Sequence, residues 1–178
     1  MEALRENNYT IDYIYSLPEG VRGELIDGEF FMMAPPSSIH QRIIGHLYVE
    51  ITNHIRAKGG SCEPFIAPFG VFLGGKNNYV EPDLSVICDK NKITDKGCEG
   101  APDWIIEVVS PGSHRNDYMV KLFKYRTAGV KEYWIVDPRD KTVTIYNFVA
   151  NDMEKKVFSD ELKSSIFDDL TISLSTFS

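Results

Sequence analysis

Two apolar segments with a helical segment between them constrain the fold more than any other feature of the sequence. Residues 103–110 (DWIIEVVS) and 131–137 (KEYWIVD) are rich in the β-branched and aromatic residues that strands favour. Between them, residues 115–128 show helical periodicity, and Gly129 is a typical residue at a helix end. A strand–helix–strand connection lays its two strands parallel, so we expect a mixed β-sheet in which these segments are neighbours.

The remaining segments complete an order of helix, three strands, helix and strand. This α/β (α+β) pattern predicts a central mixed β-sheet flanked by helices. The tail from Asn151 to Ser178 is weakly patterned, which predicts one short strand and a loosely packed end. After a short N-terminal helix, the patterned segments are a hairpin with a central Asp-Gly pair at residues 23–33, an amphipathic helix at 39–60, strands at 61–73 and 79–89, and a last strand at 141–148.

Length and composition fit a single domain, residues 1–178, with its core at about residues 22–148. No apolar run approaches the roughly 20 residues of a membrane helix, and the N-terminus lacks the apolar region of a secretory signal, so we expect a cytoplasmic protein without membrane contact. Cys62, Cys88 and Cys98 form no CxxC pair, which favours reduced, structural thiols. The net charge of −7 counts against a protein that coats DNA non-specifically.

Acidic residues lie inside two of the apolar strands. Side chains alternate along a strand, so Glu107 shares one face of its strand with Val109, and Asp83 occupies one face of the strand before it. If the two strands pair, Asp83 and Glu107 come close enough to repel each other unless a proton or a cation lies between them. A hard divalent cation such as Mg²⁺, or Mn²⁺, suits such a site. The simpler alternative is that Asp83 caps a strand after Pro82 and that Glu107 pairs with a lysine.

Lys121 is the basic residue best placed to meet Glu107. Glu107 lies about 10 Å before the end of its strand and Lys121 about 9 Å into the next helix, at ~3.3 and ~1.5 Å per residue, so the two should be level. A helical wheel puts Lys121 at the margin of a buried stripe and Lys124 on the solvated side. The alternative role of Lys121 is a surface i,i+4 pair with Asp117. The stripe consists of Tyr118, Met119, Leu122, Phe123 and Tyr125.

His40 and Glu24 are two further candidates for the same site. His40 falls on the apolar face of the first long helix, where a histidine is more often a satisfied core residue than a ligand. Glu24 lies in the opening hairpin and either reaches the site or supports the turn. Five basic residues are predicted near the site, which favours a polyanionic substrate: Arg115, Lys121, Lys124, Arg126 and Lys131.

A set of short motifs resembles a known family. The motifs are ELIDGE, SSIHQRI, VEPDLSVI, APDWIIEVVSPGS and AGVKEYWIVDP, together with the D-x-x-x-K-x-x-x-Y spacing of Asp117, Lys121 and Tyr125. From about Glu24 to Pro138 this set is similar to the bacterial Uma-type family, described as endonucleases of the restriction-endonuclease-like PD-(D/E)XK superfamily. The resemblance implies a restriction-endonuclease-like core of helix, three strands, helix and strand, and a homodimer.

The resemblance also implies a role for each candidate residue. Asp83 matches the metal-binding aspartate of the superfamily and Glu107 its glutamate, so both would hold Mg²⁺ together with the backbone carbonyl of Val108. The superfamily lysine normally lies two residues after that glutamate, where this chain has Val109. Lys121 would take over its role from the helix.

The function that follows is Mg²⁺-dependent hydrolysis of phosphodiester bonds in DNA, in which Lys121 orients water or stabilises the charged transition state. His40 would match a polar residue that the first helix commonly supplies, whereas Asp103, in a second Pro-Asp pair, lies too far along its strand to share the metal. Two alternatives stay open. One is a catalytically silent nuclease-fold protein that binds DNA or a protein partner, and the other is an enzyme acting on RNA or a small phosphorylated molecule.

Overall fold

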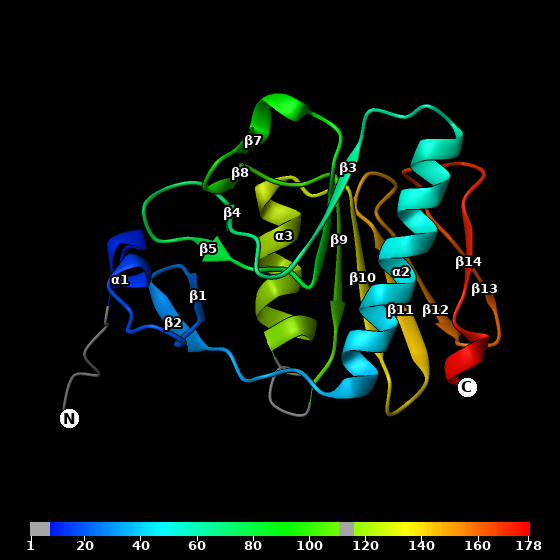
Figure 1. The fold of residues 1–178 in the computed structure, drawn as a ribbon, viewed down its shortest axis with the longest axis horizontal. Helices are drawn as coiled ribbons and strands as arrows, with labels where there is room; N and C mark the ends of the chain where they lie inside the picture. Colours follow the sequence, from blue (N-terminus) through cyan, green and yellow to red (C-terminus); the bar gives the residue numbers. More distant parts are fainter. Residues whose placement is uncertain (1–7, 111–115) are drawn as a thin grey trace.

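A mixed six-stranded sheet forms the centre of the computed structural model, which describes residues 8–110 and 116–178 (Figure 1). Its strand order is β12-β11-β10-β9-β6-β3. β9 (Trp104–Val108) and β10 (Glu132–Asp137) run parallel, as their helical connection predicts, and the other pairs are antiparallel. The other strands are β3 (Glu63–Ile66), β6 (Leu84–Ile87), β11 (Thr142–Asn147) and β12 (Asp152–Val157).

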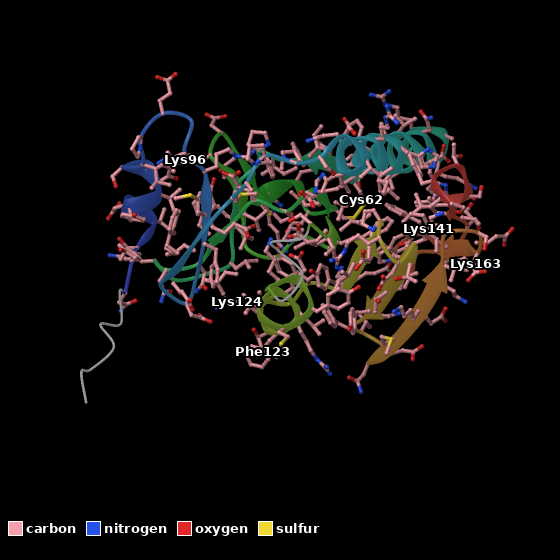
Figure 2. The ribbon with its side chains drawn as sticks, turned by 90° about the horizontal axis from the view of Figure 1, so that it is seen from below. Cys62, Lys96, Phe123, Lys124, Lys141 and Lys163 are labelled. Atoms are coloured by element: carbon pink, nitrogen blue, oxygen red, sulfur yellow. A yellow bond between two sulfur atoms is a disulfide. The ribbon has the colours of Figure 1, made fainter. Side chains whose placement is uncertain are left out.

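Helices cover opposite faces of this large sheet (Figure 2). On one face lies α2 (Ser38–Ala57), and on the other a π-helical turn (Asn116–Lys121) continues into α3 (Leu122–Ala128) and ends at Gly129, whose φ is 97°. The order α2, β3, β6, β9, α3, β10 is the predicted helix, three strands, helix and strand. Among the described residues, no helix is both long and apolar enough to cross a membrane.

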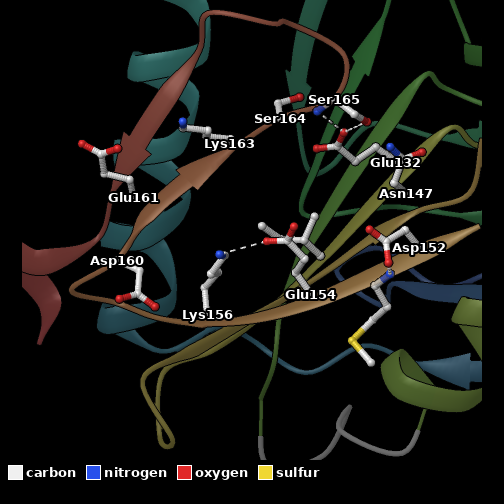
Figure 3. A pocket seen from close by; sticks show the side chains of 12 residues that line it. Glu132, Asn147, Asp152, Glu154, Lys156, Asp160, Glu161, Lys163, Ser164 and Ser165 are labelled. Carbon is white, nitrogen blue, oxygen red and sulfur yellow. Dashed lines mark hydrogen bonds and ion pairs between the residues drawn. The ribbon is translucent and has the colours of Figure 1, made fainter. Parts of the chain in front are cut away.

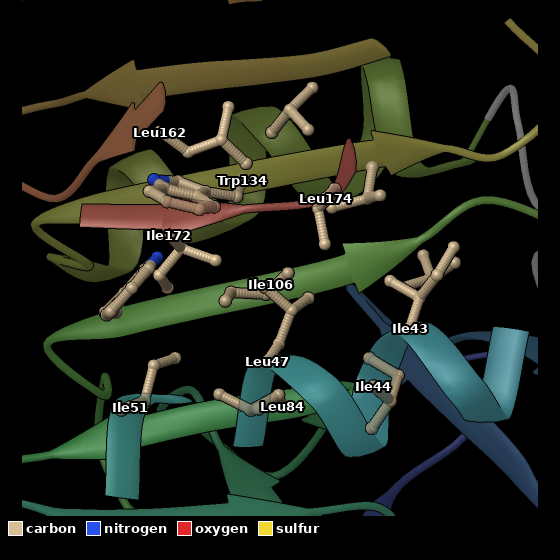
Figure 4. Close-up of a cluster of buried hydrophobic side chains, with 14 of the residues drawn as sticks. Ile43, Ile44, Leu47, Ile51, Leu84, Ile106, Trp134, Leu162, Ile172 and Leu174 are labelled. Carbon is tan, nitrogen blue, oxygen red and sulfur yellow. The ribbon is translucent and has the colours of Figure 1, made fainter. Parts of the chain in front are cut away.

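Apolar residues of α2 fix this helix against the strands that carry Asp83 and Glu107. Ile43, Leu47 and Ile51 are fully buried and belong to one cluster with Leu84 and Ile106 of β6 and β9 (Figure 4). Removing such side chains from water stabilises the fold by about 1.5–3 kcal/mol for each one fully buried. The site therefore lies on strands whose opposite faces are firmly packed.

The C-terminal tail is not loosely packed, so that prediction is wrong. Besides β12, it forms a hairpin of β13 (Glu161–Lys163) and β14 (Thr171–Ser173). Leu162 and Ile172 of this hairpin, and Leu174 directly after it, are fully buried in the cluster that also contains α2 residues (Figure 4). Each strand is only three residues long, which is too short for its alternation of apolar residues to be recognised in the sequence.

A second six-stranded sheet, in the order β2-β1-β5-β4-β8-β7, packs on the side of the large sheet that carries α3. The predicted hairpin is confirmed, with its turn at Asp27 and Gly28, where φ is 51° and 83°. A short helix, α1, precedes it. The bounds are Ile11–Tyr15 for α1, Gly23–Ile26 for β1, Glu29–Met32 for β2, Val71–Phe72 for β4, Tyr79–Val80 for β5, Ile93–Thr94 for β7 and Gly97–Glu99 for β8.

Two segments predicted as single strands are each divided between the sheets. Residues 61–73 contain β3 and β4, and residues 79–89 contain β5 and β6. Pro68 and Pro82 stand at the two breaks, and proline cannot donate a hydrogen bond to a strand ladder. The chain crosses between sheets where the Ala67 N–H donates to the carbonyl of Asp83 (3.2 Å), so Asp83 lies at the start of β6, beside the junction of the two sheets.

Cys62 and Cys88 form a disulfide bond, so the expectation of reduced thiols is wrong for these two residues. They lie just beyond the paired residues Glu63 and Ile87 of β3 and β6, and the antiparallel register brings them opposite each other. A separation of 26 residues gives no sign of this proximity in the sequence. Cys98 is a free, buried thiol, and its burial raises its pKa to about 11.

Candidate active site

Asp83 and Glu107 lie side by side where β6 begins and β9 ends. The register pairs Leu84 with Ile106, and the next position along this ladder brings Asp83 opposite Glu107. The Asp83 N–H donates to Oε2 of Glu107 (3.3 Å), and Oδ2 of Asp83 accepts the N–H of Val108 (2.8 Å). The predicted approach of the two acids is therefore confirmed, and backbone hydrogen bonds fix both carboxylates in place.

Lys121 extends its ammonium group among three carboxylates at this place. Its Nζ lies 2.8 Å from Oε2 of Glu24, 2.9 Å from Oε1 of Glu107 and 3.7 Å from Oδ1 of Asp117. The four side chains are only 3–7% exposed. The alternative of a surface pair between Asp117 and Lys121 is wrong, because the pair is buried and is the longest of the three contacts. Glu24 reaches the site and does more than support its turn.

The π-helical turn explains why the helical wheel misplaced several residues. Met119 and Phe123, predicted as buried, are 62% and 68% exposed, whereas Asp117, Lys121 and Tyr125 are buried. A π turn bonds residue i to i+5 and is wider than an α turn, so it rotates the residues that follow it relative to a regular helix. Asp117, Lys121 and Tyr125, which are four residues apart, then lie along one line of the helix surface. Lys121 therefore lies at the centre of the buried face and not, as predicted, at its margin.

Two buried tyrosines complete the hydrogen bonds around these acids. The Tyr125 hydroxyl donates to Oε1 of Glu107 (2.7 Å), and the Tyr133 hydroxyl donates to the backbone carbonyl of Asp117 (3.2 Å). Burial and the charge of Glu107 raise the pKa of Tyr125 well above its usual value, so the phenol stays protonated and can donate. The sequence predicted Tyr125 only as an apolar residue of the stripe, although its spacing from Lys121 carried the signal.

His40 contacts Asp83 directly. Its Nε2 lies 2.9 Å from Oδ2 of Asp83, and its Nδ1 is buried without a hydrogen-bond partner among the described residues. Because a carboxylate oxygen only accepts, Nε2 carries the proton and donates. This contact orients Asp83, and the unpartnered Nδ1 distinguishes His40 from a satisfied core histidine.

A second layer of polar residues holds Glu24. Its Oε1 accepts the N–H of Glu81 (3.0 Å), and the Glu81 carboxylate in turn accepts hydrogen bonds from the Tyr79 hydroxyl (2.8 Å) and from Nε of Arg22 (2.9 Å). No role was predicted for Arg22 or Tyr79. Only the alternation of Glu81 with Asp83 along the chain could have signalled this layer.

Negative charge exceeds positive charge in this network. Burial raises the pKa of Glu107 well above its usual value, and the carboxylates of Asp83, Asp117 and Glu24 add to the effect while Lys121 opposes it. Burial alone lowers the pKa of Lys121, but the surrounding carboxylates raise it well above its usual value, so Lys121 stays charged. Four carboxylates and one ammonium group leave a site that a further cation would stabilise.

A cavity of about 200 Å³ opens onto these residues. Asp83, Glu107 and Val108 line it, together with Lys121 and His40. No group of three or more His, Cys, Asp or Glu side chains forms a ready ligand set in residues 8–110 and 116–178. Mg²⁺ does not require one, because it is commonly held by one or two carboxylates, waters and substrate phosphates. The oxygen donors of Asp83, Glu107 and the Val108 carbonyl fit such an ion.

Asp103 lies away from the candidate site, as predicted, and Val109 packs among apolar residues. Val109, at the position where a lysine was expected, is buried in the apolar cluster under α3. Asp103 binds Nζ of Lys131 (2.7 Å) and the N–H of Cys88 (2.8 Å). Burial alone raises the pKa of Asp103, but these hydrogen bonds bring it below its usual value. It stabilises the opposite end of β9 from Glu107.

The predicted cluster of basic residues does not form at the site. Lys124 pairs with Asp27 in the hairpin turn (2.5 Å), Arg126 binds Asn151, and Lys131 binds Asp103. Arg115 lies outside the described residues. Among the described residues that line the cavity, Arg22 and Lys121 are the basic ones, and both pair with acids.

Two larger cavities lie elsewhere and contain none of the predicted site residues. One, of about 680 Å³, lies between α2 and β3. The other, of about 670 Å³, lies between β12 and β13 (Figure 3). The buried acid of the second cavity, Glu132, accepts hydrogen bonds from the Trp134 indole (2.6 Å) and from the Ser165 N–H (2.5 Å), so its polar atoms are satisfied within the protein. The acids beside β6 and β9 remain the strongest candidate.

Comparison with known proteins identifies the family and the fold of the chain. The model of the Uma2 family, described as "Putative restriction endonuclease", matches residues 11–175. The chain belongs to the Uma2 family. A crystal structure from Anabaena variabilis ATCC 29413, described as "a putative nuclease belonging to DUF820", has the same fold with a TM-score of 0.77 and 22% identity, over 95% of this chain and 97% of that one. The restriction-endonuclease-like fold is thereby confirmed for this Uma2 protein.

Two curated relatives of this Uma2 protein come from Synechocystis sp. (strain ATCC 27184 / PCC 6803 / Kazusa). "Uncharacterized protein slr1290" is 26% identical over 125 residues, which are 70% of this chain and 65% of the relative. "Uncharacterized protein sll1609" is 28% identical over 119 residues, which are 65% of this chain and 66% of the relative. The similarity thus spans slightly less than two thirds of each relative's own length.

Proposed function

We propose that this protein is a Mg²⁺-dependent endonuclease that hydrolyses phosphodiester bonds of DNA. The observation that carries the proposal is the pairing of Asp83 and Glu107 at one cavity, with the ammonium group of Lys121 bound to Glu107 (2.9 Å). The family and the fold support a nuclease. The excess of buried negative charge supports the binding of a cation at the same place.

Asp83, Glu107 and the backbone carbonyl of Val108 would hold the metal, which is Mg²⁺ or Mn²⁺. When bound, such an ion supplies Lewis-acid chemistry, because it polarises a phosphate and lowers the pKa of a water. His40 keeps Asp83 oriented through its hydrogen bond of 2.9 Å. Glu24 and Glu107 hold the ammonium group of Lys121 at the cavity, where it would stabilise negative charge that develops on the phosphate.

The second candidate is a catalytically silent protein that keeps the fold to bind DNA or a partner. Two observations favour it. Val109 stands where a lysine was expected and is buried among apolar residues. The charged groups that Nζ of Lys121 contacts are the carboxylates of Glu24, Glu107 and Asp117. In that case the lysine would serve only to neutralise buried acids.

Metal binding and plasmid cleavage separate the two candidates. For a nuclease, calorimetry should show binding of Mn²⁺ or Mg²⁺ that Asp83→Asn removes, and supercoiled plasmid should be cut only by the protein that binds metal. Asp103→Asn is the matched control, since Asp103 also follows a proline but binds Lys131 at the other end of β9. A native protein that binds metal but never cuts DNA or RNA would favour the silent alternative.

The homodimer and the cytoplasmic location stay predictions. A dimer would bring two copies of the candidate site into one assembly. Light scattering on the purified protein at several concentrations would measure its mass against the 20.2 kDa of one chain.

A further inference from the structure

The cavity at the candidate site has two chemically different sides. Acids and Lys121 form one side. The other is a continuous stretch of the chain, which runs from the end of β2 toward α2 and which we call the apolar wall; it consists of Phe31, Met32, Met33, Ala34, Pro35 and Pro36. Met32 is 74% exposed, although a methionine side chain is more stable away from water. Phosphate and metal ions are bound by charged and polar groups, so neither accounts for an apolar surface beside the site.

Residues of the site hold both ends of the apolar wall. In the β1–β2 hairpin, Phe31 lies directly opposite Glu24, the acid that binds Lys121. The Met33 N–H donates to the carbonyl of Arg22 (2.9 Å), and Pro36 leads into α2, which supplies His40. In Figure 1 this stretch runs past the end of β9. The wall is thus fixed relative to Asp83 and Glu107.

The charges around the cavity do not suit a duplex. Proteins that bind duplex DNA commonly neutralise several phosphates with free lysines and arginines. The lysine and the arginine that line the cavity among the described residues are already paired, Arg22 with Glu81 and Lys121 with Glu24 and Glu107. A volume of about 200 Å³ also suits one nucleoside better than a stacked base pair.

We propose that the apolar wall receives the nucleoside next to the scissile phosphate, so that the preferred substrate is an unpaired strand rather than an intact duplex. This inference rests on the proposed nuclease function and names the substrate class of the same site. Only an unpaired base offers its flat face to apolar side chains, and such contacts add affinity where the described cations of the cavity are already bound to acids.

The test compares Met32→Ala with Met153→Ala, an equally simple change at an exposed methionine of β12. Fluorescence anisotropy measures the binding of one labelled oligonucleotide, first as a single strand and then annealed to its complement. Hydrolysis is followed on methyl p-nitrophenyl phosphate, a plain diester without a nucleoside, and on thymidine 5′-p-nitrophenyl phosphate, which has one. We expect Met32→Ala to weaken single-strand binding and to raise the KM for the thymidine ester by about fivefold, a larger change than for the plain diester, whereas Met153→Ala should leave binding and both KM values unchanged.

The outcomes separate the two proposals. If neither ester is hydrolysed while Met32→Ala still weakens single-strand binding, the nuclease proposal fails and the apolar wall remains a nucleoside site. If the plain diester is hydrolysed but Met32→Ala behaves like Met153→Ala with every ligand, the inference about the wall is wrong and the nuclease proposal stands. Tighter binding of the duplex than of the single strand by the native protein would also overturn the inference.

Discussion

The ammonium group of Lys121 lies 2.9 Å from Oε1 of Glu107, a residue fourteen positions earlier in the chain and on a different element. The same Nζ lies 2.8 Å from Glu24, so one helix residue connects an acid of the large sheet with an acid of the small one. Because all three side chains are buried, each depends on the others for compensation of its charge.

Replacing Lys121 with methionine should therefore affect both stability and activity. Lys121→Met keeps the length of the side chain but leaves Glu24 and Glu107 without their cation, and breaking a buried ion pair in this way costs about 3–5 kcal/mol. Urea unfolding would measure this loss, and plasmid cleavage should disappear. Lys124→Met is the control, because Lys124 pairs with the exposed Asp27 and its loss should cost less than about 1 kcal/mol. Equal effects of the two substitutions would contradict the arrangement described for Lys121.

Removing the negative charge of Glu107 should have the opposite effect on stability. Its pKa is raised on folding, so its contribution to stability is fully present below its unfolded pKa and is lost as the pH rises through the folded pKa. At neutral pH, Glu107→Gln should thus be at least as stable as the native protein, since Lys121 keeps Glu24 as a partner, and the difference should shrink toward acid pH. Thermal unfolding across this range measures it. A large destabilisation at pH 7 would show that the charge of Glu107 is needed for folding.

The same variant separates metal binding from folding. Added Mn²⁺ should raise the melting temperature of the native protein, because a ligand that binds only the folded state stabilises it, by about 2.7 kcal/mol at a concentration 100 times the Kd. Glu107→Gln should lose this rise together with plasmid cleavage while remaining folded. A rise of the same size in both proteins would place the metal elsewhere.

Tyr125 should act through Glu107 as a positioning residue. Tyr125→Phe removes one hydrogen bond to a buried carboxylate (2.7 Å), which should cost about 1–3 kcal/mol. It also removes a donor that favours the ionised form of Glu107, so cleavage should require a higher pH than in the native protein. The pH profile of cleavage is the decisive measurement, since a purely structural role would leave it unshifted. Tyr146→Phe, at a half-buried tyrosine of β11, is the control for the loss of a phenol.

The sequence predicted those parts of the fold and site that depend on local pattern. The alternation in β6 and β9, together with the helical connection from β9 to β10, was enough to bring Asp83, Glu107 and Lys121 together. Contacts between distant elements could not be predicted in this way. The hydrogen bond between Glu81 and Glu24 joins residues 57 positions apart in sequence, and no local period signals it.

Two local features were misjudged because the pattern assumed regular geometry. A helical wheel assumes a regular α-helix without a π turn, so it predicted Met119 and Phe123 as buried, although both are exposed. Prolines 68 and 82 divide two apolar segments between the sheets, whereas alternation alone reads each segment as one strand. In both cases the backbone hydrogen bonds determine which side chains face the site. The pattern of apolar residues does not show these bonds.

The disulfide between Cys62 and Cys88 predicts a stability effect that is separate from activity. It joins the edge strand β3 to β6 and closes a loop of 26 residues, and a bond of this kind stabilises a fold by about 3 kcal/mol, chiefly by restricting the unfolded chain. The double variant Cys62→Ser, Cys88→Ser should therefore unfold at a lower urea concentration. Its plasmid cleavage at low temperature should stay unchanged, because neither cysteine lines the candidate cavity.

The disulfide bond itself can be checked by titrating the thiols of the unsubstituted protein after denaturation. Without reductant the titration should find one thiol, that of Cys98, and after reduction it should find all three. Three thiols without reductant in freshly purified protein would show that the bond is absent in solution.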